Sequence, residues 1–154
     1  MLFPTHLVAG ALLARWSNLP VAAVVAGTII PDLVDKPLGS LGVTNFFHTV
    51  GHSGLVVLLF VPLAFYGRTG LAVWVGWVSH LALDAAHIVI NGRPADTQFL
   101  LWPLLHPTGQ VQLPPGEFAL FYLWSPSFFV EVGIWLVFLG ALVETYTEIQ
   151  LWPR

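Results

Sequence analysis

Residues 70–90 read GLAVWVGWVSHLALDAAHIVI, and this stretch decides the fold. Its length matches the roughly 20 residues that an α-helix needs to cross the hydrocarbon core of a membrane. Three ionisable side chains interrupt it, His80, Asp84 and His87, and their i, i+4, i+7 spacing places them on one face of a helix. The stretch therefore predicts a transmembrane helix with one polar face.

The composition of the whole chain indicates a multi-pass protein of the cell membrane. Of the 154 residues, 56% are hydrophobic and 8% are charged, whereas about a quarter are charged in an average soluble domain. The mean hydropathy of +0.80 excludes a water-soluble globule. The net charge of −3 gives no basic patch for nucleic acid. Because the chain has no cysteine, it forms no disulfide, thiolate nucleophile or cysteine zinc site.

Hydrophobic periodicity and the positions of Pro and Gly predict an all-α, polytopic membrane fold, one domain over residues 1–154. At about 1.5 Å per residue, the first two helices are too short to span and form a half-depth hairpin that turns at residues 15–18. The third helix has Thr44 or Asn45 as its N-cap and a kink at Pro62. With the fourth and last helices it makes about three transmembrane helices. The expected helices are Pro4–Ala14, Leu19–Ile30, Asn45–Tyr66, Gly70–Ile90 and Ser127–Thr147, with a long loop over Asn91–Glu117.

Most other histidines and aspartates of the site-bearing helices, residues 4–90, lie near helix ends. If consecutive helices alternate in direction, the first and third begin, and the second and fourth end, at one membrane face. Those ends carry the imidazoles and carboxylates, so we expect one buried polar site. Its candidate metal ligands are His6, Asp32, Asp35, His48, His52, His80, Asp84 and His87.

Three positions allow a second interpretation. His87 could form a hydrogen bond behind the ligands instead of binding the ion. His106 precedes a proline in the long loop, where a loop residue without a role in the site is the simpler interpretation. Glu131 lies near the site end of the last helix, as a further ligand or base, or facing water.

The chemistry of this cluster indicates a divalent transition metal. An aspartate inside the bilayer costs at least ~2.5 kcal/mol on insertion scales and is retained where it pairs or functions. Without a cation, the clustered carboxylates repel one another and take up protons. Mixed imidazole and carboxylate ligands favour zinc, manganese or iron over magnesium or calcium. The candidates exceed what one tetrahedral zinc takes, so we expect two or more ions, most simply zinc.

Several motifs resemble the predicted membrane-bound metal-dependent hydrolases of the YdjM-like group, over roughly residues 1–105. Their order is also similar to that of the zinc phospholipase C and single-strand nuclease superfamily, whose members hydrolyse phosphoesters at several zinc ions. Thr49 departs from the first family, which usually has Arg there, so a cation that could hold an anionic substrate is missing. The motifs are Thr5-His6-Leu7, residues 27–35 (GTIIPDLVD), residues 48–53 (HTVGHS), residues 80–84 (HLALD) and Leu101-Trp102-Pro103.

The resemblance implies hydrolysis of a phosphoester, and the residues suit that reaction. Two metal ions polarise the phosphoryl oxygens and lower the pKa of a bound water. Asp35 or Asp84 could orient or deprotonate that water as the catalytic carboxylate. Lys36 and Arg93 are expected on the same face, where they bind the substrate phosphate or serve as juxtamembrane anchors. The loop over residues 91–117 could form a lid or a groove for a lipid chain.

Three functions remain open at this point. The first is a membrane-embedded hydrolase that cleaves a lipid-like phosphoester with a metal-activated water. The second is a divalent-metal transporter or metal-binding membrane regulator, because intramembrane His and Asp clusters also mark ion pathways. The third is a non-catalytic membrane scaffold with a structural metal, whose coordination should be filled. The sequence leaves the substrate headgroup, the oligomeric state and the membrane face of the site open.

Overall fold

The computed structural model describes residues 1–106, 113 and 115–151. Over these residues the chain forms seven α-helices, one 3₁₀ helix and no β-strand, so the predicted all-α class is confirmed. The elements are α1 (Phe3–Ser17), α2 (Val21–Ser40), α3 (Gly54–Leu59), α4 (Val61–Ala64), α5 (Gly67–Ile90), η1 (Pro94–Leu101), α6 (Pro115–Tyr122) and α7 (Pro126–Leu151).

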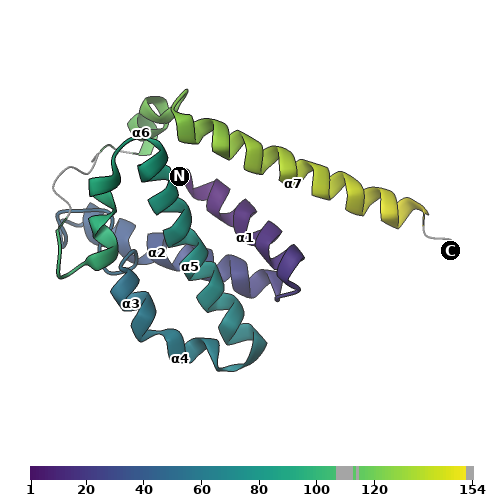
Figure 1. Ribbon diagram of the computed structural model, residues 1–154, viewed down its shortest axis with the longest axis horizontal. Helices are drawn as coiled ribbons and strands as arrows, with labels where there is room; N and C mark the ends of the chain where they lie inside the picture. The colour runs from purple at the N-terminus through teal and green to yellow at the C-terminus, as the bar shows by residue number, and fades with distance from the viewer. Residues whose placement is uncertain (107–112, 114, 152–154) are drawn as a thin grey trace.

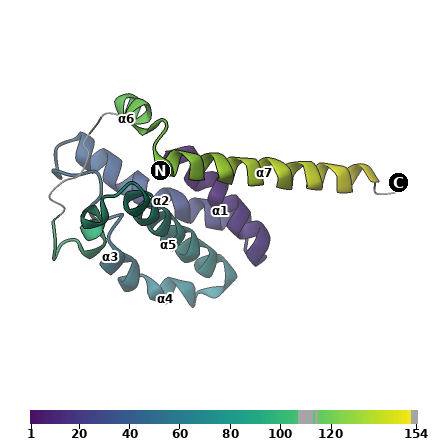
Figure 2. The same cartoon turned by 45° about the horizontal axis from the view of Figure 1, so that its top comes forward.

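The helix α5 is the centre of the fold. The helices α1, α2, α3, α4 and α7 and the 3₁₀ helix η1 all contact it, and α2 has the most extensive contact. Figure 1 shows α5 crossing α2, with α3 and α4 along one side. The helix α7 lies beside α1, and both Figure 1 and Figure 2 show it extending beyond the other helices.

The first two helices form a hairpin, but α2 is longer than its sequence predicts. Asn18 ends α1 with φ 55°, a left-handed conformation that asparagine tolerates at a helix C-terminus. The helix α2 then continues through Pro31 and Pro37 to Ser40, so the expected end at Ile30 is wrong. Packing against α5 overrides the unfavourable helix propensity of the two prolines. Asp32 and Asp35 consequently lie inside a helix, not at its end.

The predicted third transmembrane helix, Asn45–Tyr66, is also wrong. Residues 41–53 form turns and bends, and only the short helices α3 and α4 follow. Ser53, not Thr44 or Asn45, is the N-cap of α3, and its side chain accepts a hydrogen bond from the backbone N–H of Val56. Pro62 lies in the first turn of α4 instead of kinking a long helix.

Two helices of the described chain are long and apolar enough to cross a membrane. They are Gly67–Ile90, with a mean hydropathy of 1.4, and Pro126–Gln150, with a mean hydropathy of 2.0. They correspond to two of the expected spans and start slightly earlier. Only 11% of the apolar window of α7 is buried within the protein, against 39% for α5. The helix α7 therefore presents most of its apolar surface to its surroundings.

Part of the expected loop over residues 91–117 is helical. The 3₁₀ helix η1 and the start of α6 lie in it. Residues 107–112 and 114 of the expected lid lie outside the described residues. Asn91 at the end of α5 binds Ser127 at the start of α7, because its Nδ2 donates to Ser127 Oγ at 2.7 Å and its Oδ1 accepts from the backbone N–H of Ser127 at 3.2 Å. The two long helices are thus joined at the same end.

Glycines allow α2 and α5 to cross at close range. A Cβ atom at Gly27 of α2 would overlap the backbone carbonyl of Val73 in α5. A Cβ atom at Gly76 of α5 would overlap the carbonyl of Val24 in α2. Backbone groups cannot move aside as a flexible side chain can, so this crossing requires glycine on both helices.

We expect Gly27→Ala to destabilise the protein, because the added methyl group forces α2 away from α5. Overpacking of this kind costs ~1–3 kcal/mol, which thermal unfolding in detergent would register as a lower Tm. The matched control is Gly133→Ala in α7, where an added Cβ meets no atom within 4 Å. Equal Tm values for the two variants would contradict the close crossing.

Candidate metal centre

Imidazoles from three parts of the chain, α1, the loop over residues 41–53 and α5 itself, converge on Asp84 of α5. His6 Nε2 lies 3.2 Å from Asp84 Oδ1, and His80 Nε2 lies 3.3 Å from Asp84 Oδ2. His52 Nε2 and His48 Nε2 lie 3.5 and 3.7 Å from the same Oδ2. His6, His52, His80 and Asp84 are at most 4% exposed. The single buried polar site that the sequence predicts is therefore present in the fold.

Six of the eight candidate ligands form groups that could hold a metal ion. In each group, the ligand atoms lie within 4.8 Å of one another. His52, His80 and Asp84 each belong to two groups. An imidazole nitrogen has one lone pair and binds one ion, but the two oxygens of Asp84 could bridge two ions, one held by His6 and His80 and the other by His48 and His52. Mixed nitrogen and oxygen donors of this kind suit zinc, manganese or iron. The three groups are His6–His80–Asp84, Asp32–His52–His80 and His48–His52–Asp84.

Asp35 lies behind His52 and not among these groups. Its carboxylate accepts hydrogen bonds from the backbone N–H groups of Thr49, Gly51 and His52 at 2.7, 2.9 and 3.1 Å. His52 Nδ1 also lies 2.8 Å from it. Burial raises the pKa of Asp35, but hydrogen bonds from His52, Gly51 and Thr49 outweigh this effect and lower the pKa to about 2. The ionised carboxylate can only accept, so His52 Nδ1 donates, and in the neutral imidazole Nε2 then carries the lone pair.

His80 is oriented in the same way by a backbone group. Its Nδ1 lies 2.7 Å from the carbonyl oxygen of Thr28 in α2. Because a carbonyl only accepts, Nδ1 carries the proton and Nε2 presents a lone pair. This Nε2 lies 3.2 Å from His52 Nε2. In the neutral imidazoles these two lone pairs face each other, and a shared proton or a metal ion relieves their repulsion. With Asp32 and Asp84 also beside them, the donor set fits a metal ion.

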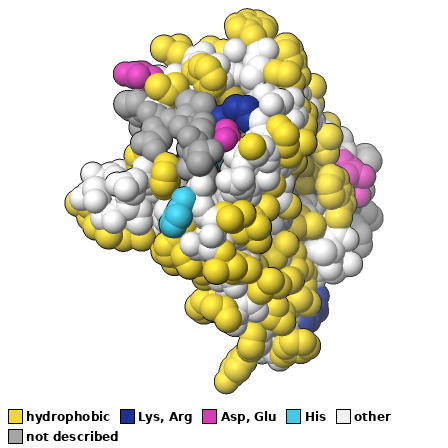
Figure 3. Space-filling view, turned by 60° about the vertical axis from the view of Figure 1, so that its left-hand side comes forward, with side chains coloured by type: hydrophobic (Ala, Val, Ile, Leu, Met, Phe, Trp, Pro, Cys, Tyr) yellow, Lys and Arg dark blue, Asp and Glu magenta, His cyan; other side chains and the backbone are white. Residues whose placement is uncertain are grey.

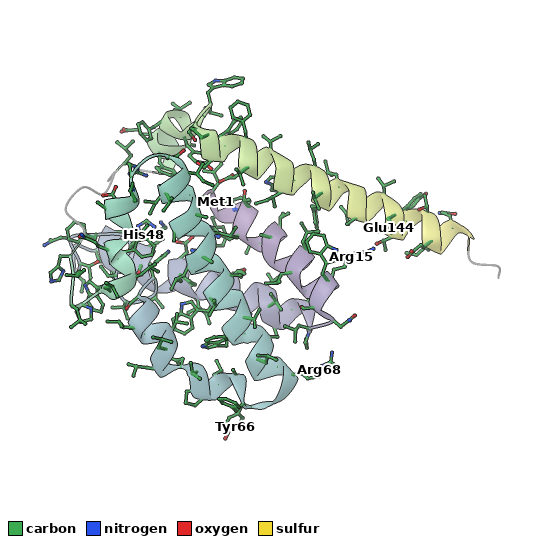
Figure 4. The ribbon with its side chains drawn as sticks, viewed as in Figure 1. Met1, Arg15, His48, Tyr66, Arg68 and Glu144 are labelled. Carbon is green, nitrogen blue, oxygen red and sulfur yellow. The ribbon has the colours of Figure 1, made fainter. Side chains whose placement is uncertain are left out.

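A cavity of about 590 Å³ borders the cluster. Asp32, His48 and Asp84 belong to its wall, together with Lys36 and Arg93. Figure 4 shows His48 and Met1 at this end of the molecule and Tyr66 and Arg68 near the opposite end of α5. In Figure 3, charged side chains lie close together within a mostly hydrophobic surface. The apolar part of the wall includes Leu2, Phe3, Ile29, Leu33, Phe47, Ile88, Leu113 and Phe118.

The two predicted substrate-binding cations both reach the cavity, each beside a carboxylate. Lys36 Nζ lies 3.4 Å from Asp32 Oδ1, and Arg93 donates to Asp96 Oδ2 at 3.2 Å. Asp96 is 8% exposed and was not expected from the sequence. The i, i+3 spacing of Arg93 and Asp96 is the sequence feature that could have predicted this ion pair.

The remaining candidates lie around the cluster. His87 borders the cavity, and its Nδ1 lies 2.7 Å from the amino nitrogen of Met1. That nitrogen also lies 2.8 Å from Asp84, a contact with no sequence signal. His106 is exposed and belongs to none of the groups found among the described residues. Glu131 is 4% exposed and binds α1, so it faces the protein interior and not water.

Asp35 therefore differs from its predicted roles. The sequence suggests it as both ligand and catalytic carboxylate, but its hydrogen bonds turn it toward residues 49–52. It is fully buried and does not border the cavity. The carbonyl of Thr28 has a similar orienting role, and no sequence pattern indicates it because it is a backbone group.

Comparisons with protein-family models, curated proteins and solved structures give no match.

We expect the purified protein to bind more than one equivalent of zinc, because the groups His6–His80–Asp84 and His48–His52–Asp84 overlap only at Asp84, whose carboxylate can bridge two ions. His80→Ala and Asp84→Ala should each remove most of the metal, since the loss of either residue leaves only one of the three groups complete. The control His106→Ala alters an exposed histidine and should leave the metal content unchanged. Elemental analysis after gel filtration measures the content, and full occupancy in both cluster variants would exclude these ligands.

Chelation should lower the Tm of the wild type, because an ion that binds only the folded site stabilises the protein by mass action. The double variant His48→Ala, His52→Ala lacks two of the donors, so the same chelator should shift its Tm far less. Thermal unfolding with and without chelator gives both shifts. Equal shifts would show that the stabilising ion lies elsewhere.

Proposed function

We propose that the protein is a membrane-embedded, metal-dependent hydrolase that cleaves a lipid-like phosphoester. The observation that carries this proposal is the pair of Nε2 atoms of His52 and His80, 3.2 Å apart, beside carboxylates that border a largely apolar cavity. A bound cation would offset the repulsion among these imidazole and carboxylate donors. A structural ion would be enclosed, whereas Asp32 and Asp84 adjoin space that a substrate can enter.

The cavity wall suits an amphiphilic ester. Its apolar side chains can contact a hydrocarbon chain, while Lys36 and Arg93 can hold an anionic headgroup. Lys36 Nζ also lies 5.7 Å from the centre of the Phe47 ring, within the range of a cation–π contact. A fully water-soluble ester would leave most of the apolar surface without a partner.

The chain's own residues can perform the steps that hydrolysis needs. Lys36 and Arg93 bind and orient the phosphoryl oxygens. Asp32 keeps 12% of its side chain exposed and borders the cavity, so its carboxylate can accept the proton of an attacking water. Asp84 is the second carboxylate at the wall. Divalent ions, when bound, supply a Lewis acid and lower the pKa of the water.

The long helices support action at a membrane. With α5 and α7 both long and apolar enough to cross a bilayer, we place the protein in the cell membrane as a multi-pass protein. Asn91 and Ser127 join those helices at the end where the cluster lies. A lipid could then reach the ligands laterally, with its headgroup at the level of Lys36 and Arg93.

We also propose membership of the YdjM-like group of membrane-bound metal-dependent hydrolases. Support comes from the order of the motifs around His6, Asp32, His48, His80 and Asp84, whose side chains meet in one cluster. The family's Arg is replaced here by Thr49, whose hydroxyl donates to Asp35 at 3.1 Å. Lys36 and Arg93 would then supply the cations for the substrate.

The test is release of phosphate or headgroup from phospholipid liposomes by the zinc-loaded protein. We expect turnover that chelator and His80→Ala abolish and that His106→Ala preserves. Because Lys36 is half exposed, Lys36→Ala should raise KM a few-fold with a smaller effect on kcat, as expected for loss of ground-state binding. Turnover of soluble phosphodiesters alone would reject the lipid substrate, and zinc-loaded protein without any esterase activity would favour a transporter or scaffold.

A further inference from the structure

Glu131 of α7 is a buried carboxylate with no part in the proposed reaction. It is 4% exposed and lies outside the candidate metal groups. Its Oε1 accepts the backbone N–H of Leu2 at 2.7 Å, and its Oε2 accepts the hydroxyl of Thr5 at 2.8 Å. One side chain of α7 thus binds the first turn of α1 at two points.

The helix α1 has no cap of its own at this end. Leu2 occupies the N-cap position without a side-chain hydrogen bond, and the first turn contains no acidic residue. Helix N-termini leave backbone N–H groups unsatisfied and carry partial positive charge. Glu131, which belongs to α7, accepts the Leu2 N–H and places a negative charge beside this helix end. The helix α7 therefore holds the first turn of α1, together with the contacts of the Met1 amino nitrogen with Asp84 and His87.

His6 lies in that first turn, directly after Thr5. Its Nε2 faces Asp84, but its Nδ1 is buried and has no hydrogen-bond partner among the described residues. The corresponding atoms of His52 and His80 are held by Asp35 and by the Thr28 carbonyl. Imidazoles that bind metal almost always have such a partner, which fixes their orientation.

Besides the contact with Asp84, two other features orient His6. One is its stack on His80, with ring centroids 3.7 Å apart and planes 11° apart. The other is the position of the α1 backbone. A third bond to the same turn, from Trp135 Nε1 to Thr5 Oγ1 at 3.1 Å, also comes from α7.

We infer that Glu131 is a positioning residue, which holds the first turn of α1 so that His6 can bind metal with His80 and Asp84. This inference rests on the metal centre of the proposed function but not on phosphoester hydrolysis. It also predicts selectivity, because the groups built around His52 do not depend on α1.

The experiment is a zinc titration of the full-length protein in detergent. Groups that orient a ligating imidazole typically contribute about 10- to 100-fold to metal affinity. We expect Glu131→Ala to weaken the binding of one zinc ion by this factor, while the remaining zinc binds with wild-type affinity. Glu131→Gln should retain wild-type affinity, because its amide oxygen accepts the Leu2 N–H and its amide nitrogen can donate to Thr5. A loss in Glu131→Gln equal to that in Glu131→Ala would overturn positioning in favour of a charge-based role.

The control for general docking of α1 on α7 is Glu144→Ala. Glu144 accepts a hydrogen bond from Arg15 at 2.9 Å, at the exposed far end of α1; both labelled residues appear in Figure 4. We expect the Glu144→Ala variant to bind all of its zinc with wild-type affinity. If Glu144→Ala weakens zinc as much as Glu131→Ala, the effect is loss of docking and the specific role is wrong.

A double-mutant cycle with His6→Ala links Glu131 to its target. If Glu131 acts through His6, Glu131→Ala should cause no further loss of zinc affinity in the His6→Ala background. A full additional loss there would overturn the proposal. Should Glu131→Ala fail to fold, Thr5→Val removes one of its two bonds at nearly constant volume, and the same non-additivity with His6→Ala is required. Wild-type protein that binds no zinc would instead refute the metal centre itself.

Discussion

The carboxylate of Asp35 is the group on which the site depends. It accepts hydrogen bonds from three backbone N–H groups of residues 49–52 and from Nδ1 of His52. Those N–H groups are the ones that a helix over this segment would have needed. The chain over residues 41–53 is consequently folded around a buried anion of α2, and His48 and His52 are carried to the cluster by a loop. The hydrogen bonds to Asp35 thus stabilise a loop where the sequence predicts a helix, and this loop contributes His48 and His52 to the candidate metal site.

The close crossing of α2 and α5 provides the other half. Gly27 and Gly76 let the two backbones approach. The backbone carbonyl of Thr28, next to Gly27, can then accept a hydrogen bond from His80 Nδ1. Each of the two central imidazoles therefore has one nitrogen fixed by α2 and the other directed at the cluster. His6 lacks this arrangement, and its place depends on the carboxylate that α7 contributes. The site is held by backbone groups and carboxylates that surround the ligands.

Much of the candidate site could be predicted from the sequence. Ionisable residues are rare in so apolar a chain, so those at helical spacing in residues 70–90 were informative. The side-chain roles were less predictable. Asp32 and Asp35 look equivalent in the sequence, but Asp32 borders the cavity and Asp35 lies behind His52. Their roles differ because the two side chains leave α2 toward different neighbours. The spacing of residues along the sequence does not indicate which neighbour each side chain meets.

By itself, the sequence determined the all-α class, two helices apolar enough to cross a membrane, and the set of residues from which the cluster is formed. These properties follow from composition and from spacing along a single helix, which are local. The tertiary structure alone decided that α2 continues through two prolines, that residues 41–53 form a loop, and that Glu131 faces α1. Each of these outcomes depends on a partner distant in the chain. A buried carboxylate binds whatever donors the fold brings to it, and those donors are known only when the helices are packed.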